Sequence, residues 1–251
     1  MRTHNHIHLR HITLYHFEQG HTAAEAFRDL NNLFGEGTIS RKTVYECDLL
    51  VRNEQNPFLN NLVTGDESWL LFKNPKRKKV CIDAGQTPKR IPKVVHCKKA
   101  MWCVWWDHIE QKWRIPDRNG KRQYNLNSDV YLAQLDRLQA AIEAKRQRKK
   151  NHIVFHHDNA RPHVEGRVVQ SITDKGWDLL PHPPYSPTDY HVNRSVKNWQ
   201  SGKFFDDFYE LVANIKEWVA SKKRDFFARG IDRLPAKWEA VCEVDGEYTP
   251  E

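Results

Sequence analysis

The sequence lacks the features of a secreted or membrane-spanning protein. Its five cysteines include no Cys-x-x-Cys pair and no regular spacing, and their odd number argues against a fully disulfide-paired secreted scaffold. No apolar stretch at the start is long enough for a signal peptide, and no later stretch reaches transmembrane length. We therefore expect a soluble, intracellular protein with reduced cysteines and no membrane partner.

Acidic residues are too few to balance the basic ones. Forty Lys and Arg stand against thirty-two Asp and Glu, which gives a net charge of +8 and a pI near 9.2. This excess favours a polyanionic partner, although charge predicts binding and not fold. The 251 residues suffice for one large domain, or for a small and a medium one, around a buried core.

Three short helices are predicted in the first 46 residues. The apolar spacing of residues 7–19 fits an amphipathic helix, Thr22 and Glu25 form a capping box for a second, and Ser40 caps a third. Such helices, joined by tight Gly turns, resemble a helix-turn-helix, and the alternative is a helical cap on the neighbouring domain. Because no turn signal follows the third helix, it can also continue into the next segment. Its candidate DNA-contacting residues are Arg41, Lys42, Thr43 and Tyr45.

The remainder alternates apolar strands with helices, which predicts a mixed α/β sheet domain. A loop rich in Gly, Pro and Lys is expected at 83–99, and loops of that length are usually functional. The basic run at 145–150 is either a nuclear address, a phosphate-contacting patch or a solvated helix end. Strands are expected at 60–64, 68–72, 80–82, 100–106, 153–155 and 177–180, and helices at 129–144, at about 162–175 and from Thr188 onward.

The stretch IVFHHDNARPH at 153–163 carries the most chemistry. A short apolar strand leads here to Asp158, and the sheet holds such a carboxylate rigidly while the following loop leaves it open to metal, water or substrate. The alternative is that Asp158 caps the helix suggested by residues 162–171, since Asp is common just before a first-turn Pro. Asp66 is predicted to lie near the edge of an apolar strand in the same way.

Three motifs, read together, resemble the catalytic motifs of mariner transposases, which are cut-and-paste DNA transposases. They are VTGDESW at 63–69, VFHHDNARPH at 154–163 and HPPYSPTDYH at 182–191. The resemblance continues in MWCVWWD, LNSDVYLAQLDRL, GKFFDD and RGIDRLPAKWEAVCEVDGEY, and the N-terminal helices look like the family's first helix-turn-helix. It therefore covers nearly the whole chain from residue 58.

The resemblance implies a helix-turn-helix segment at 1–46 and a ribonuclease-H-like catalytic domain at 47–251. It implies that Asp66, Asp158 and Asp189 bind two Mg²⁺ or Mn²⁺ ions for DNA strand cleavage and transfer. It also implies double-stranded DNA of the transposon-end type as partner, a homodimer and a nuclear location. Supporting roles are expected for Glu67, Asn159 and His163, and DNA contacts for Lys76, Arg77, Lys78 and Lys79.

Two departures from the family pattern leave the activity open. The family's second helix-turn-helix and linker are missing, so specific DNA affinity should fall because half of the contacts are lost. In addition, thirty residues separate Asp158 from Asp189, four fewer than in the family. The shorter connection either displaces Asp189 or delivers it to the same helix start. The chain is thus a metal-dependent DNA-cleaving transposase descendant, a catalytically inactive or host-adapted DNA-binding protein, or a non-functional fragment.

Overall fold

The computed structural model describes residues 6–76, 97–108, 111–114, 126–145, 152–180 and 185–243. The strand predicted at 80–82 and most of the loop predicted at 83–99 lie outside these residues. No helix in the described ranges is long and apolar enough to cross a membrane. In chain order the elements are α1 (His6–Glu18), α2 (Ala23–Phe34), α3 (Arg41–Gln55), η1 (Leu59–Asn61), β1 (Leu62–Leu71), β2 (Lys99–Trp106), β3 (Gln111–Arg114), α4 (Ser128–Lys145), β4 (Val154–His156), α5 (Gly166–Asp174), β5 (Asp178–Leu179), η2 (Thr188–Asn193), α6 (Arg194–Gln200), α7 (Phe208–Ala220), α8 (Arg224–Asp232) and α9 (Leu234–Glu243).

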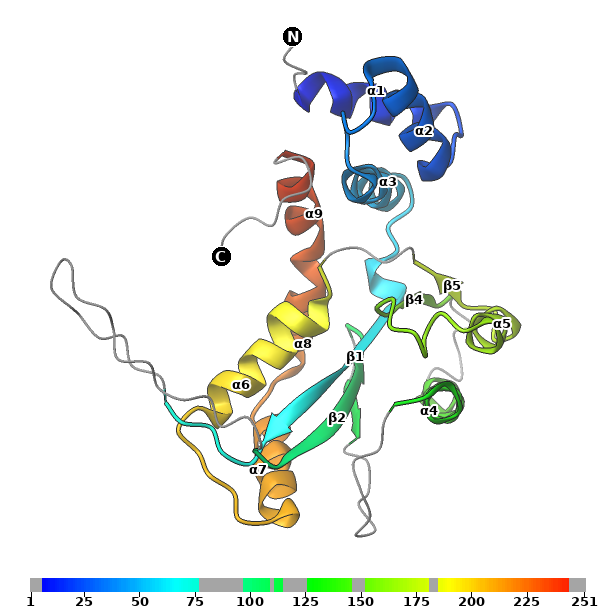
Figure 1. Ribbon diagram of the computed structural model, residues 1–251. Coiled ribbons are helices and arrows are strands. Elements are labelled where there is room, and N and C mark those ends of the chain that lie inside the picture. The colour runs from blue at the N-terminus through cyan, green and yellow to red at the C-terminus, as the bar shows by residue number, and fades with distance from the viewer. Residues whose placement is uncertain are drawn as a thin grey trace, which may run out of the picture.

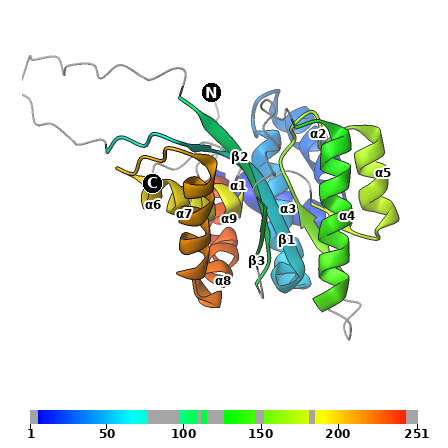
Figure 2. The same cartoon turned by 90° about the horizontal axis from the view of Figure 1, so that it is seen from below.

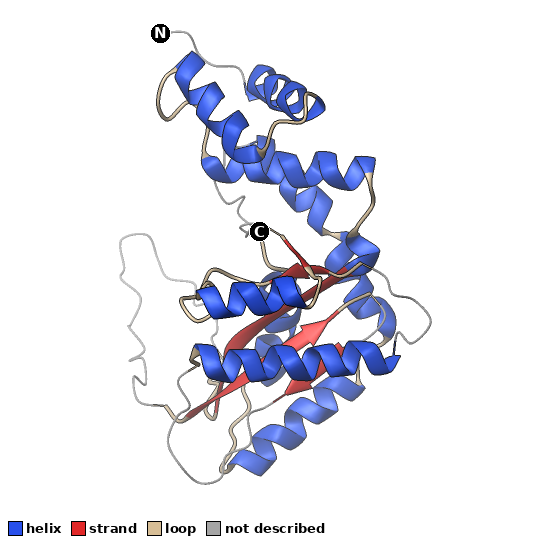
Figure 3. Cartoon of the chain, turned by 90° about the vertical axis from the view of Figure 1, so that its right-hand side faces the viewer, coloured by secondary structure: helices blue, strands red, loops and turns tan. Residues whose placement is uncertain are grey.

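The three N-terminal helices form as predicted and lie at one end of the sheet domain (Figures 1 and 3). The capping box at the start of α2 is complete, because Thr22 Oγ1 accepts from the Glu25 backbone and Glu25 Oε2 accepts from the Thr22 backbone. Ser40 caps α3 through the backbone N–H of Thr43. The helices share a small apolar core made of Leu9, Ala23, Ala26, Leu30, Ile39 and Val44.

Helix α3 joins this segment to the rest of the molecule. It runs without a break through position 46, so the predicted continuation of the third helix is confirmed, and the proposed boundary at 46/47 falls inside it. Its other neighbour is the C-terminal helix α9, where the Cys242 thiol lies 3.9 Å from the Thr43 carbonyl. The helix therefore packs against both the N-terminal core and the C-terminal helix α9 of the sheet domain.

The sheet has the strand order β3-β2-β1-β4-β5. Strands β1 and β2 are antiparallel, whereas β4 is parallel to both β1 and β5. Helices α4 and α5 cover one face, and α6 to α9 cover the other (Figure 2). The mixed sheet flanked by helices that the sequence predicts is confirmed.

The sequence prediction was wrong for β1, which is one continuous strand and not two strands around a turn at 65–67. Its residues pair with β2 without interruption from Thr64 opposite Trp106 to Leu71 opposite Lys99. Gly65 does not form a turn. It allows the Trp105 ring to approach the β1 backbone closely, because a Cβ at this position would lie 2.3 Å from that ring. Asp66 therefore lies inside a strand that is paired on its β2 side along this stretch.

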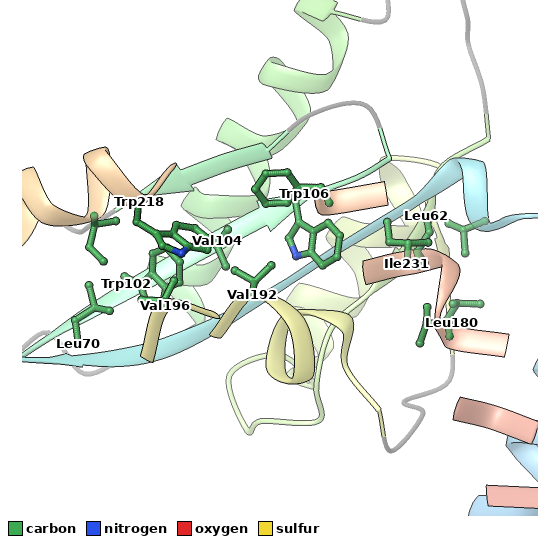
Figure 4. Close-up of a cluster of buried hydrophobic side chains, with 14 of the residues drawn as sticks. Leu62, Leu70, Trp102, Val104, Trp106, Leu180, Val192, Val196, Trp218 and Ile231 are labelled. Atoms are coloured by element: carbon green, nitrogen blue, oxygen red, sulfur yellow. The ribbon is translucent and has the colours of Figure 1, made fainter. Parts of the chain in front are cut away.

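Alternation along β1 and β2 separates two apolar cores. On the face toward α6 to α9, Trp102 packs edge-on against Trp218 with ring centroids 6.1 Å apart, and Trp106 lies nearby (Figure 4). On the other face, Trp105 stacks on Phe155 at 5.1 Å. Because Asp66 follows the even-numbered positions, it points toward η2 and α6, while Glu67 points toward α4.

Replacing Gly65 by Ala is expected to lower the free energy of unfolding by about 1 to 3 kcal/mol, the usual cost of overpacking. The added methyl meets the Trp105 ring and the Val104 carbonyl, which lies 2.7 Å from the Cβ position, so the strand pair must shift. Urea unfolding of the wild type and the variant measures the effect. Gly166→Ala is the control, because its Cβ position is open.

Candidate active site

Asp66 lies in the middle of β1, on the sheet face covered by η2 and α6. Its carboxylate accepts a hydrogen bond from the Asn193 side-chain amide, with 3.0 Å between Asn193 Nδ2 and Asp66 Oδ2. The same Nδ2 lies 3.3 Å from Asp189 Oδ1. One amide group thus connects two of the three predicted metal ligands, which come from parts of the chain more than a hundred residues apart.

The helical segment that carries Asp189 is fixed at three points. The Trp106 indole N–H donates to Thr188 Oγ1 at 2.9 Å, and the Tyr190 hydroxyl donates to the Gly230 carbonyl at 2.6 Å. His191 Nε2 lies 2.6 Å from the Phe226 carbonyl. The segment is a π-helical turn, a rare form that is frequent at functional sites. The shorter connection from Asp158 therefore delivers Asp189 to a helix start beside Asp66.

The electrostatics of this carboxylate pair favour a cation. Burial raises the pKa of Asp66 to about 8, and the nearby Asp189 and Glu67 carboxylates add to the rise. Like charges held this close favour the protonated form of one partner. A divalent cation would remove that repulsion, and carboxylate and amide oxygens are the donors that Mg²⁺ and Mn²⁺ prefer. The residues present fit such an ion.

Asp158 lies two residues past the end of β4, in the loop that follows the strand, as predicted. Its Oδ1 accepts from the Ala160 backbone at 3.1 Å and lies 2.5 Å from His163 Nδ1. The alternative that Asp158 caps the next helix is wrong, because α5 begins only at Gly166 and its N-cap residue is Glu165. Residues 161–165 form turns that place His163 against Asp158.

His163 is buried and connects Asp158 to Glu67. Its ring stacks on Tyr131 with centroids 3.9 Å apart, and its Nε2 lies 3.5 Å from Glu67 Oε2. The Cys103 thiol approaches the other Glu67 oxygen at 3.4 Å, and burial raises the pKa of Glu67. Glu67 and His163 therefore hold Asp158 from the α4 side of the sheet, while Asn159 is exposed.

The register of the parallel strands relates Asp158 to Asp66. Thr64 pairs with His156, and each aspartate lies two residues further along the chain, Asp66 within β1 and Asp158 just past the end of β4. The two aspartates thus lie at the same level across the neighbouring strands. The ligand atoms of Asp66, Asp158 and Asp189 do not all lie within 4.8 Å of one another. Within the described residues, the group of metal-ligating side chains that meets this distance contains none of these aspartates.

Sequence reasoning missed two residues of this site, Asn193 and Tyr131. Asn193 follows Asp189 by four positions, the spacing that puts two side chains on one helix face. Tyr131 carries the His163 ring, and its hydroxyl lies 2.6 Å from His157 Nδ1. The contacts of Tyr131 with His163 and His157 join segments that are distant in the sequence, so no sequence pattern predicts them. The four-residue spacing of Asn193 from Asp189 is visible in the sequence.

The predicted DNA-contacting residues are in different surroundings. Arg41 is exposed and lies 5.9 Å from the ring centroids of both Phe27 and Tyr45, whereas Lys42 and Tyr45 are half-buried. Thr43 is buried, and its hydroxyl bonds to the Ser40 hydroxyl at 2.7 Å. Lys76 is exposed. Arg77, Lys78 and Lys79 lie outside the described residues.

The strand order, with one acidic residue inside β1 and a second just past the end of the adjacent β4, defines a ribonuclease-H-like catalytic core. Family models agree with this class of protein. The model described as the helix-turn-helix domain in Mos1 transposase matches residues 6–47, and the model described as transposase (partial DDE domain) matches residues 71–152. The chain belongs to the mariner family of transposases.

Its relatives include mariner Mos1 transposase of Drosophila mauritiana, which is 36% identical over 216 residues (80% of this chain, 60% of the relative). Histone-lysine N-methyltransferase SETMAR of Homo sapiens is 34% identical over 222 residues (85% of this chain, 32% of the relative). The chain thus spans less than two thirds of each of these two relatives. The crystal structure of the Mos1 catalytic domain matches with a TM-score of 0.69 and 30% identity, covering 86% of this chain and 97% of that one. A Mos1 paired-end complex with Mn matches at 0.70 and 26% identity, covering 98% and 99%.

Proposed function

We propose that the protein binds DNA of the transposon-end type and cleaves or transfers its strands in a reaction that depends on a divalent metal ion. The observation that carries the proposal is the Asp66–Asn193–Asp189 arrangement, in which two carboxylates from separate elements share one amide donor. Homology supports the proposal, because the related Mos1 structures include paired-end complexes with Mn and with Mg.

Asp66, Asp158 and Asp189 would hold Mg²⁺ or Mn²⁺ in a two-metal site. Bound there, such ions activate a water or a 3′-hydroxyl and stabilise the leaving oxygen of the phosphodiester. The chain's own groups prepare this site. Asn193 holds the Asp66 and Asp189 carboxylates beside each other, and His163 fixes Asp158 through Oδ1.

The proposal includes a homodimer as the acting form and the nucleus as the place of action. Support for the dimer comes from kinship alone, and a nuclear location follows from chromosomal DNA as the substrate. The net charge of +8 is consistent with a polyanionic substrate.

The test is nicking of supercoiled plasmid in Mg²⁺ or Mn²⁺ by the wild type and by Asp158→Ala at the same salt concentration. We expect the wild type to produce open-circular DNA and the variant to lose that activity. Asp174→Ala is the control, since Asp174 is an exposed residue at the end of α5 whose carboxylate accepts a hydrogen bond from the Gln170 side-chain amide. Metal-dependent nicking that survives Asp158→Ala would sink the proposal.

A second candidate function is DNA binding without catalysis. The observation that favours it is the direct junction of α3 with the catalytic domain, which leaves a single helix-turn-helix module. This second function predicts that the protein binds DNA in a gel-shift assay, while neither the wild type nor any variant nicks the plasmid.

Replacing Arg41 and Lys42 together by Ala is expected to weaken DNA binding about tenfold or more at physiological salt. If each contacts one phosphate, the slope of log affinity against log salt should fall by about 2. Fluorescence anisotropy at several salt concentrations measures both quantities. The matched control is Lys216→Ala with Arg224→Ala, which removes the same charge from exposed positions on α7 and α8. An unchanged salt slope in the first variant would exclude α3 as the DNA-contacting helix.

A further inference from the structure

A second group of metal-ligating side chains lies in the N-terminal helical segment. It consists of His16 near the end of α1, His21 in the turn after it, and Asp29 on α2. One ligand atom from each lies within 4.8 Å of the other two. Within the described ranges, no other three His, Cys, Asp or Glu side chains meet this closely. None of the three belongs to the proposed catalytic site.

The distances within the cluster bracket those of a tetrahedral metal centre. His16 Nδ1 and His21 Nδ1 are 2.8 Å apart, and His16 Nδ1 is 3.9 Å from Asp29 Oδ2. Ligands that bind zinc at about 2.0 to 2.2 Å in a tetrahedron lie roughly 3.4 Å from one another. Small side-chain rotations, which widen the first distance and shorten the second, convert the cluster into a coordination site.

The backbone holds two of the ligands in place before any ion binds. Gly20 ends α1 with φ of +80°, a conformation that glycine adopts without strain, and this turn brings His21 back over the helix. The His21 backbone N–H then bonds to the His16 carbonyl at 3.0 Å. The two imidazole rings lie 5.0 Å apart by centroid with both Nδ1 atoms facing inward.

Only His16 of the three residues is buried. Its side chain is 11% exposed, whereas that of Asp29 is 47% exposed and His21 is an exposed residue, so an ion and a completing water would enter from the side of His21 and Asp29. The cluster joins α1 and its following turn to α2, and both helices share an apolar core with α3. An ion here would therefore fix α1 and its following turn to α2, and through that core support α3.

The donor set selects the class of metal. Two imidazole nitrogens and one carboxylate suit borderline ions such as Zn²⁺ and Co²⁺, whereas Mg²⁺ prefers oxygen donors alone. We propose that His16, His21 and Asp29 form a structural site for a zinc-class divalent ion, separate from the oxygen-ligand site of the catalytic domain. The competing description is a simple hydrogen bond between the two rings, with one Nδ1 protonated.

The test is titration of metal-free protein with Co²⁺ in excess Mg²⁺, followed by displacement with Zn²⁺. Excess Mg²⁺ occupies the carboxylate site, and the Asp158→Ala variant is titrated in parallel to exclude that site as the source of the signal. We expect one Co²⁺ per chain, with the intense visible bands of tetrahedral cobalt, in both proteins. Zn²⁺ should displace it and raise the melting temperature.

His21→Ala and Asp29→Asn should each weaken Co²⁺ and Zn²⁺ binding by more than about 100-fold, since loss of even an outer partner of a metal ligand costs about 10- to 100-fold. The matched control is His11→Ala, which removes an exposed histidine of the same helix and should bind as the wild type does. Equal metal binding by His21→Ala and His11→Ala would overturn the proposal. So would the absence of tetrahedral cobalt bands in the wild type, which would leave a hydrogen-bonded histidine pair.

Discussion

Replacing Glu46 by Gln is expected to raise the free energy of unfolding by about 3 kcal/mol at pH 7. Glu46 has no exposed surface on α3, and neither carboxylate oxygen has a hydrogen-bond partner. Burial raises the pKa of this carboxyl group to about 9, although Lys42 partly opposes the rise. A neutral amide of the same shape removes the cost of the ionisable group.

The sign follows from proton binding. Above the unfolded pKa of 4.5 the unfolded chain releases the Glu46 proton, while the folded protein keeps it until about pH 9. The unfolded state therefore binds fewer protons, so the contribution of Glu46 to stability is fully present below pH 4.5 and is lost between pH 4.5 and 9. Each pH unit in this window costs about 1.4 kcal/mol.

Urea unfolding at pH 5, 7 and 8.5 measures the difference between the wild type and Glu46→Gln. The advantage of the variant should be small at pH 5 and should grow with pH. Glu54→Gln is the control, because it makes the same change at an exposed position of the same helix. A difference that stays constant across this range would contradict the protonated state of Glu46.

Replacing Asp66 by Asn is expected to stabilise the metal-free protein and to abolish strand cleavage. Burial and the Asp189 carboxylate hold the pKa of Asp66 at about 8, so its contribution to stability is lost between pH 3.8 and 8. At pH 7 the variant should gain about 2 to 4 kcal/mol. Asn keeps the acceptor for Asn193 but cannot supply an anionic metal ligand.

A divalent metal ion should offset the stability advantage that Asp66→Asn has over the wild type in the absence of metal. Mg²⁺ or Mn²⁺ should raise the melting temperature of the wild type by mass action and leave Asp66→Asn nearly unchanged. Nicking by the variant should fall by at least about 100-fold, the typical cost of one lost electrostatic contact in a transition state. Thermal melts in chelator and in Mg²⁺, with nicking rates on the same samples, measure both effects. Equal stabilisation of the two proteins by Mg²⁺ would show that Asp66 is not a ligand.

Local signals predicted the elements whose cause is local. The capping box of Thr22 and Glu25 and the Ser40 cap set the starts of α2 and α3, and both are read from four consecutive residues. The apolar runs that became β2 and β4 were equally clear. The prediction of a turn within β1 was wrong. Gly65 is required there by the close approach of the Trp105 ring from the partner strand β2, which its sequence neighbours do not reveal.

The candidate site divides in the same way. Asp158 could be predicted, since the apolar strand that ends there is visible in the sequence, and the family motifs supplied Asp66 and Asp189. The Tyr131–His163 stack and the Asn193 bridge could not, because each joins segments that only the folded sheet brings together. The effect of the shortened connection before Asp189 also required the three anchors of η2.

The measurement that tests the central claim most directly is nicking of supercoiled plasmid in Mg²⁺ by the wild type beside Asp189→Ala, at equal protein and salt. If the shortened connection completes the metal site, the wild type converts the plasmid to open circles and Asp189→Ala does not. If both proteins nick at the same metal-dependent rate, or if neither does while both bind DNA, Asp189 is not a catalytic ligand and the proposed site is contradicted.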